Sequence, residues 1–367
     1  MKLPLQKPAP DVDRFIRVIR GEEIPLRPPL AELFLDHEVE RTIARDCLGL
    51  DWAEPVADRQ QMAAYLRSRI EVYHRMGYDY VRISGGVDFP GAYIDAPDTA
   101  AMTRGNRQWA NEIRGPIASW EDFEAYPWPD PAKADLWPYE FASTHLPEGM
   151  GLFVCPTSGF LEIPLDTLFG YQNLCYLLYE QPDLVEAVFK RVGEIICGMY
   201  GRLLGLPKLR GFFQGDDMGF KTGTLLSPDH LRAHVLPWHK KLASLAHVNG
   251  LVYLLHSCGN LEQIMSDLVE DVGIDARHSY EDEGNSVLEF KRRHGDQVAI
   301  LGGVDVDKLT RLPEPELRAY VRGILDTCMP GGRFALGSGN TVCNYVPLQN
   351  YFVMVEEAFE YSGGHGV

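Results

Sequence analysis

The sequence has few positive charges relative to its negative ones. Its 367 residues include 35 Lys and Arg against 52 Asp and Glu, which gives a formal net charge of −17 and a pI near 5.1. Nucleic acids and anionic membrane surfaces attract cationic proteins, so this balance argues against both as partners. It also disfavours a polyanionic substrate unless a local basic pocket receives it.

Long apolar runs and paired cysteines are also missing. No apolar run approaches the ~20 residues of a membrane-spanning helix, and the opening MKLPLQKPAPD is too polar and proline-rich for a secretory leader. The seven cysteines show no paired spacing, which is typical of a reducing compartment. We therefore expect a cytoplasmic protein. The sequence leaves its oligomeric state open, with a homodimer among the options.

Apolar strand candidates alternate with helical patterns along most of the chain. Hydrophobic residues make up 45% of the sequence, ample for a large core. Strands are expected at 29–35, 78–83, 151–155, 210–214, 251–255, 273–278, 298–303 and 333–337. Helices are expected at 11–20, 39–48, 55–76, 164–180, 182–204, 227–249, 261–269, 286–294, 314–328 and 347–361.

Eight strands, most of them followed promptly by a helix, predict an α/β fold of the (β/α)₈ barrel type. We expect residues 1–367 to form this one domain. An open doubly wound sheet is the runner-up. It would need a glycine-rich phosphate turn after an early strand, and Ser84-Gly85-Gly86 matches that turn poorly.

Residues 84–150 interrupt the alternation after the second strand candidate. This stretch has no sustained hydrophobic period, and it contains eight prolines and four of the six tryptophans. So long an irregular stretch in a compact domain is usually functional. We predict that it is an insertion that folds over the pocket as a lid, and that its tryptophans pack within it rather than stack on a ligand.

The most informative stretch is LVYLLHSCGN, residues 251–260. Five apolar residues predict a buried strand, and the turn pair Gly259-Asn260 follows it. Side chains alternate along a strand, so His256 and Cys258 leave its end on the same face. An imidazole beside a thiol is typical of a zinc site. The alternative is a buried thiol beside a hydrogen-bonded histidine.

In a barrel the carboxyl ends of all strands share one rim, and that rim carries the chemistry. Cys343 follows the last strand candidate and would reach the same rim. His256, Cys258 and Cys343 together would give one nitrogen and two sulfur ligands and leave one tetrahedral position open, as in catalytic zinc sites. Alternatively, Cys343 is a loop thiol and no metal binds.

Other polar residues follow the strand candidates. Asp216 and Asp217 are candidate catalytic residues, and they could ligate metal, accept a proton or cap a loop. Candidate substrate-binding residues at the same rim are Arg82, His278, Glu281, Asp305 and Asn340. His278 and Glu281 either line the pocket or bracket a turn. Arg82, with Arg104 and Arg107, either clamps an anion or pairs with surface acids.

Several longer motifs resemble the uroporphyrinogen decarboxylase superfamily, which is built on a (β/α)₈ barrel. They are FxxxxRGEEIPLRPPL at 15–30, MGYDYVRI at 76–83, SWEDFEAYPWPDP at 119–131, GDDMGFKTGTLLSPDHLRAHVLPWHKK at 215–241, HSCGN at 256–260, LGGVD at 301–305 and GSGN at 337–340. The resemblance covers nearly the whole chain.

The superfamily has two branches. True decarboxylases carry an arginine-rich segment after the first strand, where this chain reads AELFLDHEVE, with four acids and no arginine. The chain is more similar to the zinc-dependent methyltransferases that work with corrinoid proteins. Their HxC pair and late cysteine correspond to His256, Cys258 and Cys343. This resemblance implies Zn²⁺, a corrinoid supplied by a partner protein, and a small-molecule methyl donor or acceptor.

Our leading hypothesis is therefore a zinc-dependent methyltransferase that moves a methyl group between a small molecule and a corrinoid protein. The first alternative is a metal-free decarboxylase of uroporphyrinogen or a related acid, in which Asp217 stabilises a protonated intermediate. The second alternative is a non-catalytic accessory protein that binds metal or corrinoid.

Overall fold

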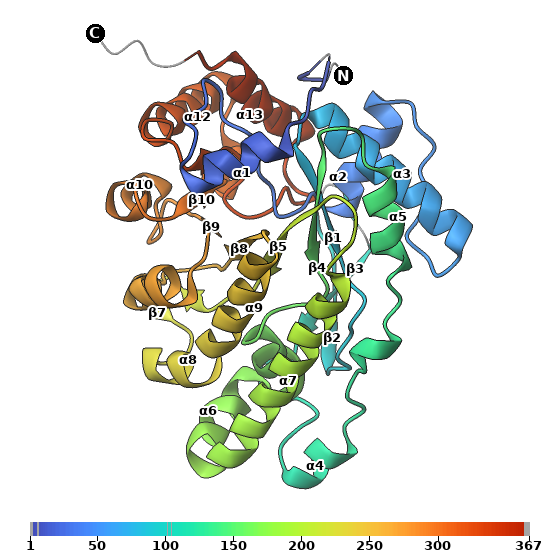
Figure 1. Cartoon of the computed structure of the whole chain (residues 1–367), viewed down its shortest axis with the longest axis vertical. Helices are drawn as coiled ribbons and strands as arrows, with labels where there is room; N and C mark the ends of the chain where they lie inside the picture. Colours follow the sequence, from blue (N-terminus) through green and yellow to red (C-terminus); the bar gives the residue numbers. More distant parts are fainter. Residues whose placement is uncertain (1–2, 6, 101, 104, 363–367) are drawn as a thin grey trace.

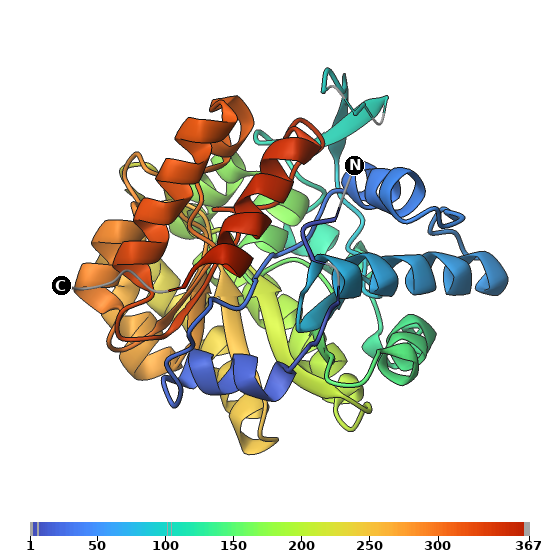
Figure 2. The same ribbon diagram turned by 90° about the horizontal axis from the view of Figure 1, so that it is seen from above.

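The structure is a computed structural model that describes residues 3–5, 7–100, 102–103 and 105–362, and its centre is one curled sheet of seven parallel strands. Helices surround the sheet on its outside (Figures 1 and 2). In sheet order the strands are β1 (Tyr80–Ser84), β4 (Gly151–Cys155), β5 (Leu209–Gly215), β8 (Val252–His256), β9 (Ala276–His278), β10 (Ala299–Leu301) and β11 (Phe334–Ala335).

The predicted first strand, residues 29–35, does not form a full eighth strand. It runs parallel to the end of β11 through a bridge between Leu30 and Leu336, and in the described residues it forms no ladder with β1. On that side the Tyr80 hydroxyl accepts from the Glu32 amide at 3.0 Å and donates to the Glu32 carbonyl at 2.9 Å. Proline at 28 and 29 supplies no amide hydrogen, which shortens the pairing. The observed architecture is thus an incompletely closed barrel.

The inside of the curled sheet is filled at one end. Tyr80, Phe153 and Phe213 point inward from neighbouring strands and face small or aliphatic residues of the remaining strands. Helix α1 (Val12–Arg20) packs across this amino-terminal end, with the Phe15 ring 5.2 Å from the Tyr80 ring (Figure 1). Aspartate 11 caps the helix by accepting from the Arg14 amide. Because this end is plugged, the interior of the curled sheet is reached from the carboxyl ends of the strands, where the largest of the cavities lies.

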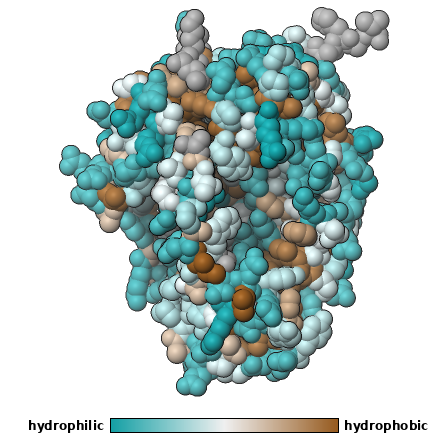
Figure 3. All heavy atoms as spheres, turned by 180° about the vertical axis from the view of Figure 1, so that it is seen from behind, coloured by the Kyte–Doolittle hydropathy of each residue, from teal (hydrophilic) through white to brown (hydrophobic). Residues whose placement is uncertain are grey.

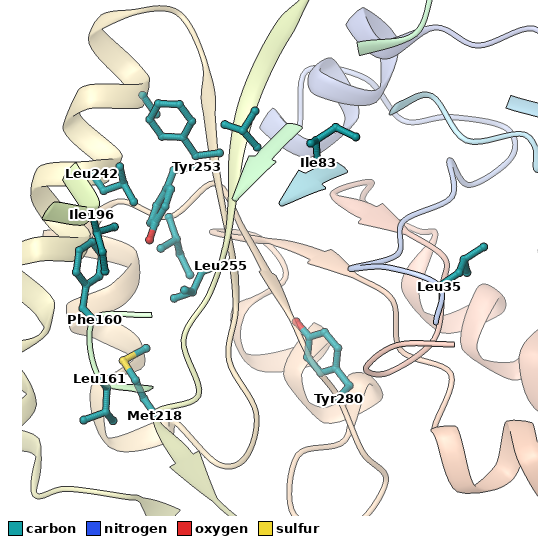
Figure 4. Close-up of a cluster of buried hydrophobic side chains, with 14 of the residues drawn as sticks. Leu35, Ile83, Phe160, Leu161, Ile196, Met218, Leu242, Tyr253, Leu255 and Tyr280 are labelled. Carbon is teal, nitrogen blue, oxygen red and sulfur yellow. The ribbon is translucent and has the colours of Figure 1, made fainter. Parts of the chain in front are cut away.

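The outer face of the sheet packs against helices. Tyr253 and Leu255 of β8 contact Leu242 and Ile196 in a continuous apolar cluster (Figure 4). The principal helices are α3 (Arg59–Met76), α5 (Trp137–His145), α6 (Tyr171–Glu180), α7 (Pro182–Leu203), α8 (Pro228–His234), α9 (Leu236–Val248), α10 (Val287–His294), α11 (Val306–Arg311), α12 (Glu314–Cys328) and α13 (Leu348–Glu360).

Four predicted helices are broken. The helix predicted at 39–48 is α2 (His37–Thr42) followed by a π-helical turn at Ile43–Cys47, and the one at 164–180 is a π-helical segment at Ile163–Phe169 followed by α6. The helix predicted at 227–249 is the pair α8 and α9. The one at 261–269 consists of short helical segments at Glu262–Ile264 and Asp267–Val272. Gly170 has a φ of 78° between Ile163–Phe169 and α6. Pro237, in the first turn of α9, cannot donate to the preceding turn, so α8 ends before it.

Residues 84–150 hold more regular structure than their sequence predicts. They include an antiparallel hairpin of β2 (Tyr93–Pro97) and β3 (Asn106–Ala110), helix α4 (Trp120–Ala125), a turn at Pro131–Lys133 and helix α5, which packs beside α3. A second small hairpin, β6 (Gly219–Phe220) with β7 (Gly223–Thr224), follows β5. The hairpin β2–β3 lies at the end of the barrel opposite α1 (Figure 1).

The four tryptophans of the insertion divide into two pairs. Trp128 and Trp137 are half-buried and pack on Phe123 and Phe141 of the same segment, with ring centroids 5.2 and 5.0 Å apart. Trp109 and Trp120 are 56% and 46% exposed. Lid behaviour of this segment stays a prediction.

Within the described residues, none of the helices combines the length and the apolar character that a bilayer crossing requires. Figure 3 shows one face that is mainly hydrophilic, with scattered apolar side chains.

Candidate metal centre

A nitrogen, a sulfur and a carboxylate oxygen meet at the carboxyl ends of β5 and β8. His256 is the last residue of β8 and pairs in register with Gly215, so Asp217 lies beside it two residues beyond β5. His256 Nε2 lies 3.5 Å from Cys258 Sγ and 3.4 Å from Asp217 Oδ1. The ligand atoms of His256, Cys258 and Asp217 all lie within 4.8 Å of one another.

The turn after β8 is held tightly around Cys258. Gly259 has a φ of 77°, and a Cβ there would lie 2.3 Å from the carbonyl carbon of Gly219, so only glycine fits. The Cys258 amide donates to Asp217 Oδ1 at 2.8 Å. The thiol accepts from Asn340 Nδ2 at 3.2 Å and from Ser279 Oγ at 3.4 Å. Asn340, predicted as a substrate-binding residue, thus contacts the candidate metal ligand directly.

His278, another predicted substrate-binding residue, lies behind His256. Their Nδ1 atoms are 2.7 Å apart, so His256 turns Nε2 toward Cys258 and Asp217. His278 is fully buried, and burial lowers its pKa well below the usual value, with a further contribution from His256. A neutral imidazole in this position orients its neighbour, as is usual beside a metal-binding histidine.

The acidities of Asp217 and Cys258 differ strongly. Burial raises the pKa of Asp217, but hydrogen bonding to His256 and its charge, together with the Cys258 amide, lower it to about 2. A carboxylate of that pKa is a weak base near neutral pH. Burial and the neighbouring Asp217 charge raise the pKa of the Cys258 thiol. The thiol is thus protonated unless a cation binds it.

Asp216 points away from this group and is fully buried. Its carboxylate accepts from the amides of Leu161 and Glu162 at 3.0 Å and from His239 Nε2 at 2.8 Å. His239 in turn contacts the Tyr253 hydroxyl at 2.6 Å. These contacts tie the loop before Ile163–Phe169 to helix α9, so Asp216 holds this loop in position. A catalytic role for Asp216 stays a prediction.

The predicted third ligand, Cys343, is not part of the group. Its thiol lies 3.2 Å from Thr341 Oγ1, in the loop after β11. The next residue, Asn344, donates its amide to Asp36 and its side chain accepts from Arg107 Nη2 at 2.7 Å. This anchoring holds Cys343 beside the first strand segment, and Asp217 is the third member of the group instead. Ligation by Cys343 stays a prediction.

A cavity of about 980 Å³ opens beside the group at the carboxyl ends of the strands. Arg82, His256 and Asn340 line it together with Cys155. The insertion contributes Val87, Asp88, Phe89, Tyr93 and Gln108 to its wall. A volume in this range suits a small-molecule site of the larger kind.

Two predicted substrate-binding residues, Asp305 and Glu281, take part in local contacts, and their role in binding stays a prediction. Asp305 caps α11 by accepting from the Lys308 amide at 3.1 Å, and its other oxygen accepts from the Asp282 amide at 2.9 Å. The backbone of Glu281 bridges to Asn285 and brackets a turn. Neither residue lines the cavity.

Sequence reasoning missed two acids near the centre, Glu162 and Asp166. Glu162 lines the cavity and accepts from Ser158 Oγ at 2.7 Å. Burial, with the charges of Asp217 and Asp216, raises the pKa of Glu162 to about 8 and that of Asp166 to about 6. The available signal was two acids, four residues apart, in the otherwise apolar run FLEIPLDTLF.

The acidic segment after the first strand candidate forms part of the cavity wall. Asp36, Glu38 and Glu40 all line it. Glu40 is fully buried, and Arg69 Nη2 lies 3.4 Å from its carboxylate. Burial raises the pKa of Glu40 to about 7, and Arg69 opposes that shift. The part of the wall that this segment contributes is therefore acidic.

The chain belongs to the uroporphyrinogen decarboxylase (URO-D) family, whose model matches residues 11–361, and it is therefore a member of an enzyme family built on the (β/α)₈ barrel. Among solved structures, a methyltransferase from Methanosarcina mazei is similar over 95% of this chain and 98% of its own length. The TM-score is 0.68 and the sequence identity 18%, so this likeness shows the fold. No curated protein matches the chain.

Proposed function

We propose that this protein is a zinc-dependent methyltransferase that moves a methyl group between a small molecule and a corrinoid protein. The observation that carries the proposal is the group of His256, Cys258 and Asp217 at the edge of a large cavity. Membership of the URO-D family is consistent with it. The structural likeness to a methyltransferase supports the proposal through the fold that the two proteins share.

The residues present fit a zinc ion. Nitrogen, sulfur and carboxylate oxygen are all zinc ligands, and three protein ligands leave one position for a substrate. His278 fixes the orientation of the His256 ring, and Asn340 and Ser279 donate to the Cys258 sulfur. Bound zinc supplies Lewis acidity, which lowers the pKa of a coordinated thiol or hydroxyl group.

The other residues bind and orient the substrate around this centre. The strand ends and the β2–β3 hairpin form the cavity wall beside this centre. Asp216 acts at a distance by fixing the loop that carries Glu162. The corrinoid would be supplied by a partner protein, as in the methyltransferases that the chain resembles.

Decarboxylation of uroporphyrinogen is the rival function within the family. It would require the cavity to receive many carboxylates. The wall residues Asp36 and Glu38 are acidic, Arg69 is already paired with Glu40, and Arg82 is one cation against many carboxylates. Each like-charge contact in a partly desolvated cleft costs on the order of a kcal/mol or more. This composition favours methyl transfer over the rival.

Metal content of purified variants tests the centre. We expect about one zinc per chain in the wild type and loss of most of it in Cys258→Ala, with the fold retained because the barrel core does not depend on the metal. Cys155→Ala is the matched control, since Cys155 lines the same cavity outside the metal group. Comparing Asp217→Asn with Cys343→Ala identifies the third ligand.

Zinc-dependent transfer of a methyl group from a methylated corrinoid to a thiol or phenol is the corresponding activity test, and Cys258→Ala should abolish it. Full zinc occupancy in Cys258→Ala, or transfer unaffected by that change, would contradict the proposed function.

A further inference from the structure

The same cavity contains an arginine that the proposed chemistry does not use. Arg82 lies on β1, directed into the barrel, and is only 5% exposed. It lines the cavity together with His256 and Asn340. Its guanidinium lies over the Phe213 ring, 5.7 Å from the centroid, and its Nε donates to the Phe213 carbonyl at 2.9 Å.

The charge of Arg82 is not balanced by an acid. Within the described residues it has no ion pair, and its two terminal nitrogens make no hydrogen bond. A largely buried guanidinium without a counter-ion is less favourable than one paired with an anion, so an anionic ligand in the cavity would stabilise it. Its remaining N–H groups are arranged for two parallel bonds to one anionic group.

The neighbouring arginines are already paired. Arg69 lines the cavity but lies 3.4 Å from Glu40 and donates to the Tyr65 hydroxyl at 2.7 Å. Arg107 Nε lies 3.1 Å from Asp98. Arg104, predicted with them as an anion clamp, lies outside the described residues. Among the described arginines of the cavity, Arg82 therefore has its charge available to a ligand.

We propose that Arg82 binds an anionic group of the small-molecule substrate, and that this substrate is a carboxylate whose other end carries the thiol or hydroxyl group directed at His256 and Cys258. This inference rests on the proposed function for the identity of the second end. One unpaired cation selects a substrate with a single anionic group. The acidic residues Asp36 and Glu38 in the same wall would repel a substrate with further anionic groups. Arg82 is thus a specificity-determining residue.

Binding of matched thiols tests this assignment. Zinc-loaded full-length protein is titrated by calorimetry with mercaptoacetate, mercaptopropionate and mercaptobutyrate, each beside the neutral mercaptoalcohol of equal chain length. We expect at least one carboxylate to bind about tenfold or more tightly than its alcohol, as for a charged hydrogen bond in a desolvated site. Arg82→Gln should bring the ratio of the carboxylate affinity to the alcohol affinity close to one, and Arg82→Lys should keep part of this preference. Arg311→Gln, 75% exposed and outside the cavity, is the control and should keep the full ratio.

Thermal unfolding separates a binding role from a structural one. Arg82→Gln should melt no lower than the wild type, because it removes a buried charge that lacks a partner. A lower melting temperature with an unchanged binding ratio would show a structural role and overturn the proposal, as would the absence of any carboxylate preference in the wild type. If zinc removal leaves all affinities unchanged while the preference still depends on Arg82, the proposed metal chemistry fails and the assignment of Arg82 stands.

Discussion

Two adjacent aspartates should respond very differently to the same substitution. Asp216 is fully buried and accepts from two amides and His239, whereas the Asp217 side chain is 37% exposed beside His256. An asparagine at 216 places amide hydrogens against groups that are themselves donors. One or more buried N–H groups would then lose their acceptor, at about 1–3 kcal/mol each.

We therefore predict that Asp216→Asn lowers the free energy of unfolding by about 3–5 kcal/mol, the range for breaking a buried pair. Asp217→Asn should change it by about 1 kcal/mol or less, because a partly exposed pair contributes little. Urea unfolding followed by circular dichroism measures both. Zinc content should show the reverse order, with the larger loss in Asp217→Asn. Equal stability of Asp216→Asn and the wild type would refute the positioning role of Asp216.

Two further predictions concern the closure of the barrel beside the first strand segment. Burial raises the pKa of Glu32 to about 8, opposed by its bonds from Ser338. The folded state thus binds a proton that the unfolded state releases, so stability should fall as pH rises from about 4.5 to about 8. Urea unfolding across that range should show a flatter dependence in Glu32→Gln, and an identical slope would contradict the shift. At Gly337 a Cβ would lie 1.7 Å from the Ala31 carbonyl oxygen, so Gly337→Ala should lower the melting temperature by several degrees or more. Gly201→Ala, with open space around its Cβ, is the control. Equal melting temperatures of the two variants would contradict the close contact between Gly337 and Ala31.

The regular elements were predictable where local patterns decide them. β4 and α12 have the expected bounds, because an apolar five-residue run and an amphipathic helix are each specified within their own residues. The β2–β3 hairpin was missed because its strands pair only with each other and are largely exposed, so they show no buried face. A full strand was predicted at residues 29–35, but its prolines limit the backbone pairing to isolated bridges.

The candidate centre was predictable only in part. The approach of His256 to Cys258 follows from the alternation of side chains along a strand. Asp217 joins them because Gly215 lies opposite His256, and the register of neighbouring strands cannot be read from sequence. The position of Cys343 depends on the contacts of Asn344 with Asp36 and Arg107, which are far apart in the chain.

The choice between the two branches of the family depends most directly on one comparison. The purified protein is incubated separately with uroporphyrinogen and with a methylated corrinoid plus a panel of thiols and phenols, with and without zinc. We predict no carbon dioxide from the first. From the second we predict zinc-dependent demethylation, seen in the corrinoid spectrum, with at least one acceptor and lost in Cys258→Ala. Efficient release of carbon dioxide from uroporphyrinogen, unchanged in Cys258→Ala, would contradict the methyltransferase assignment and establish the decarboxylase instead.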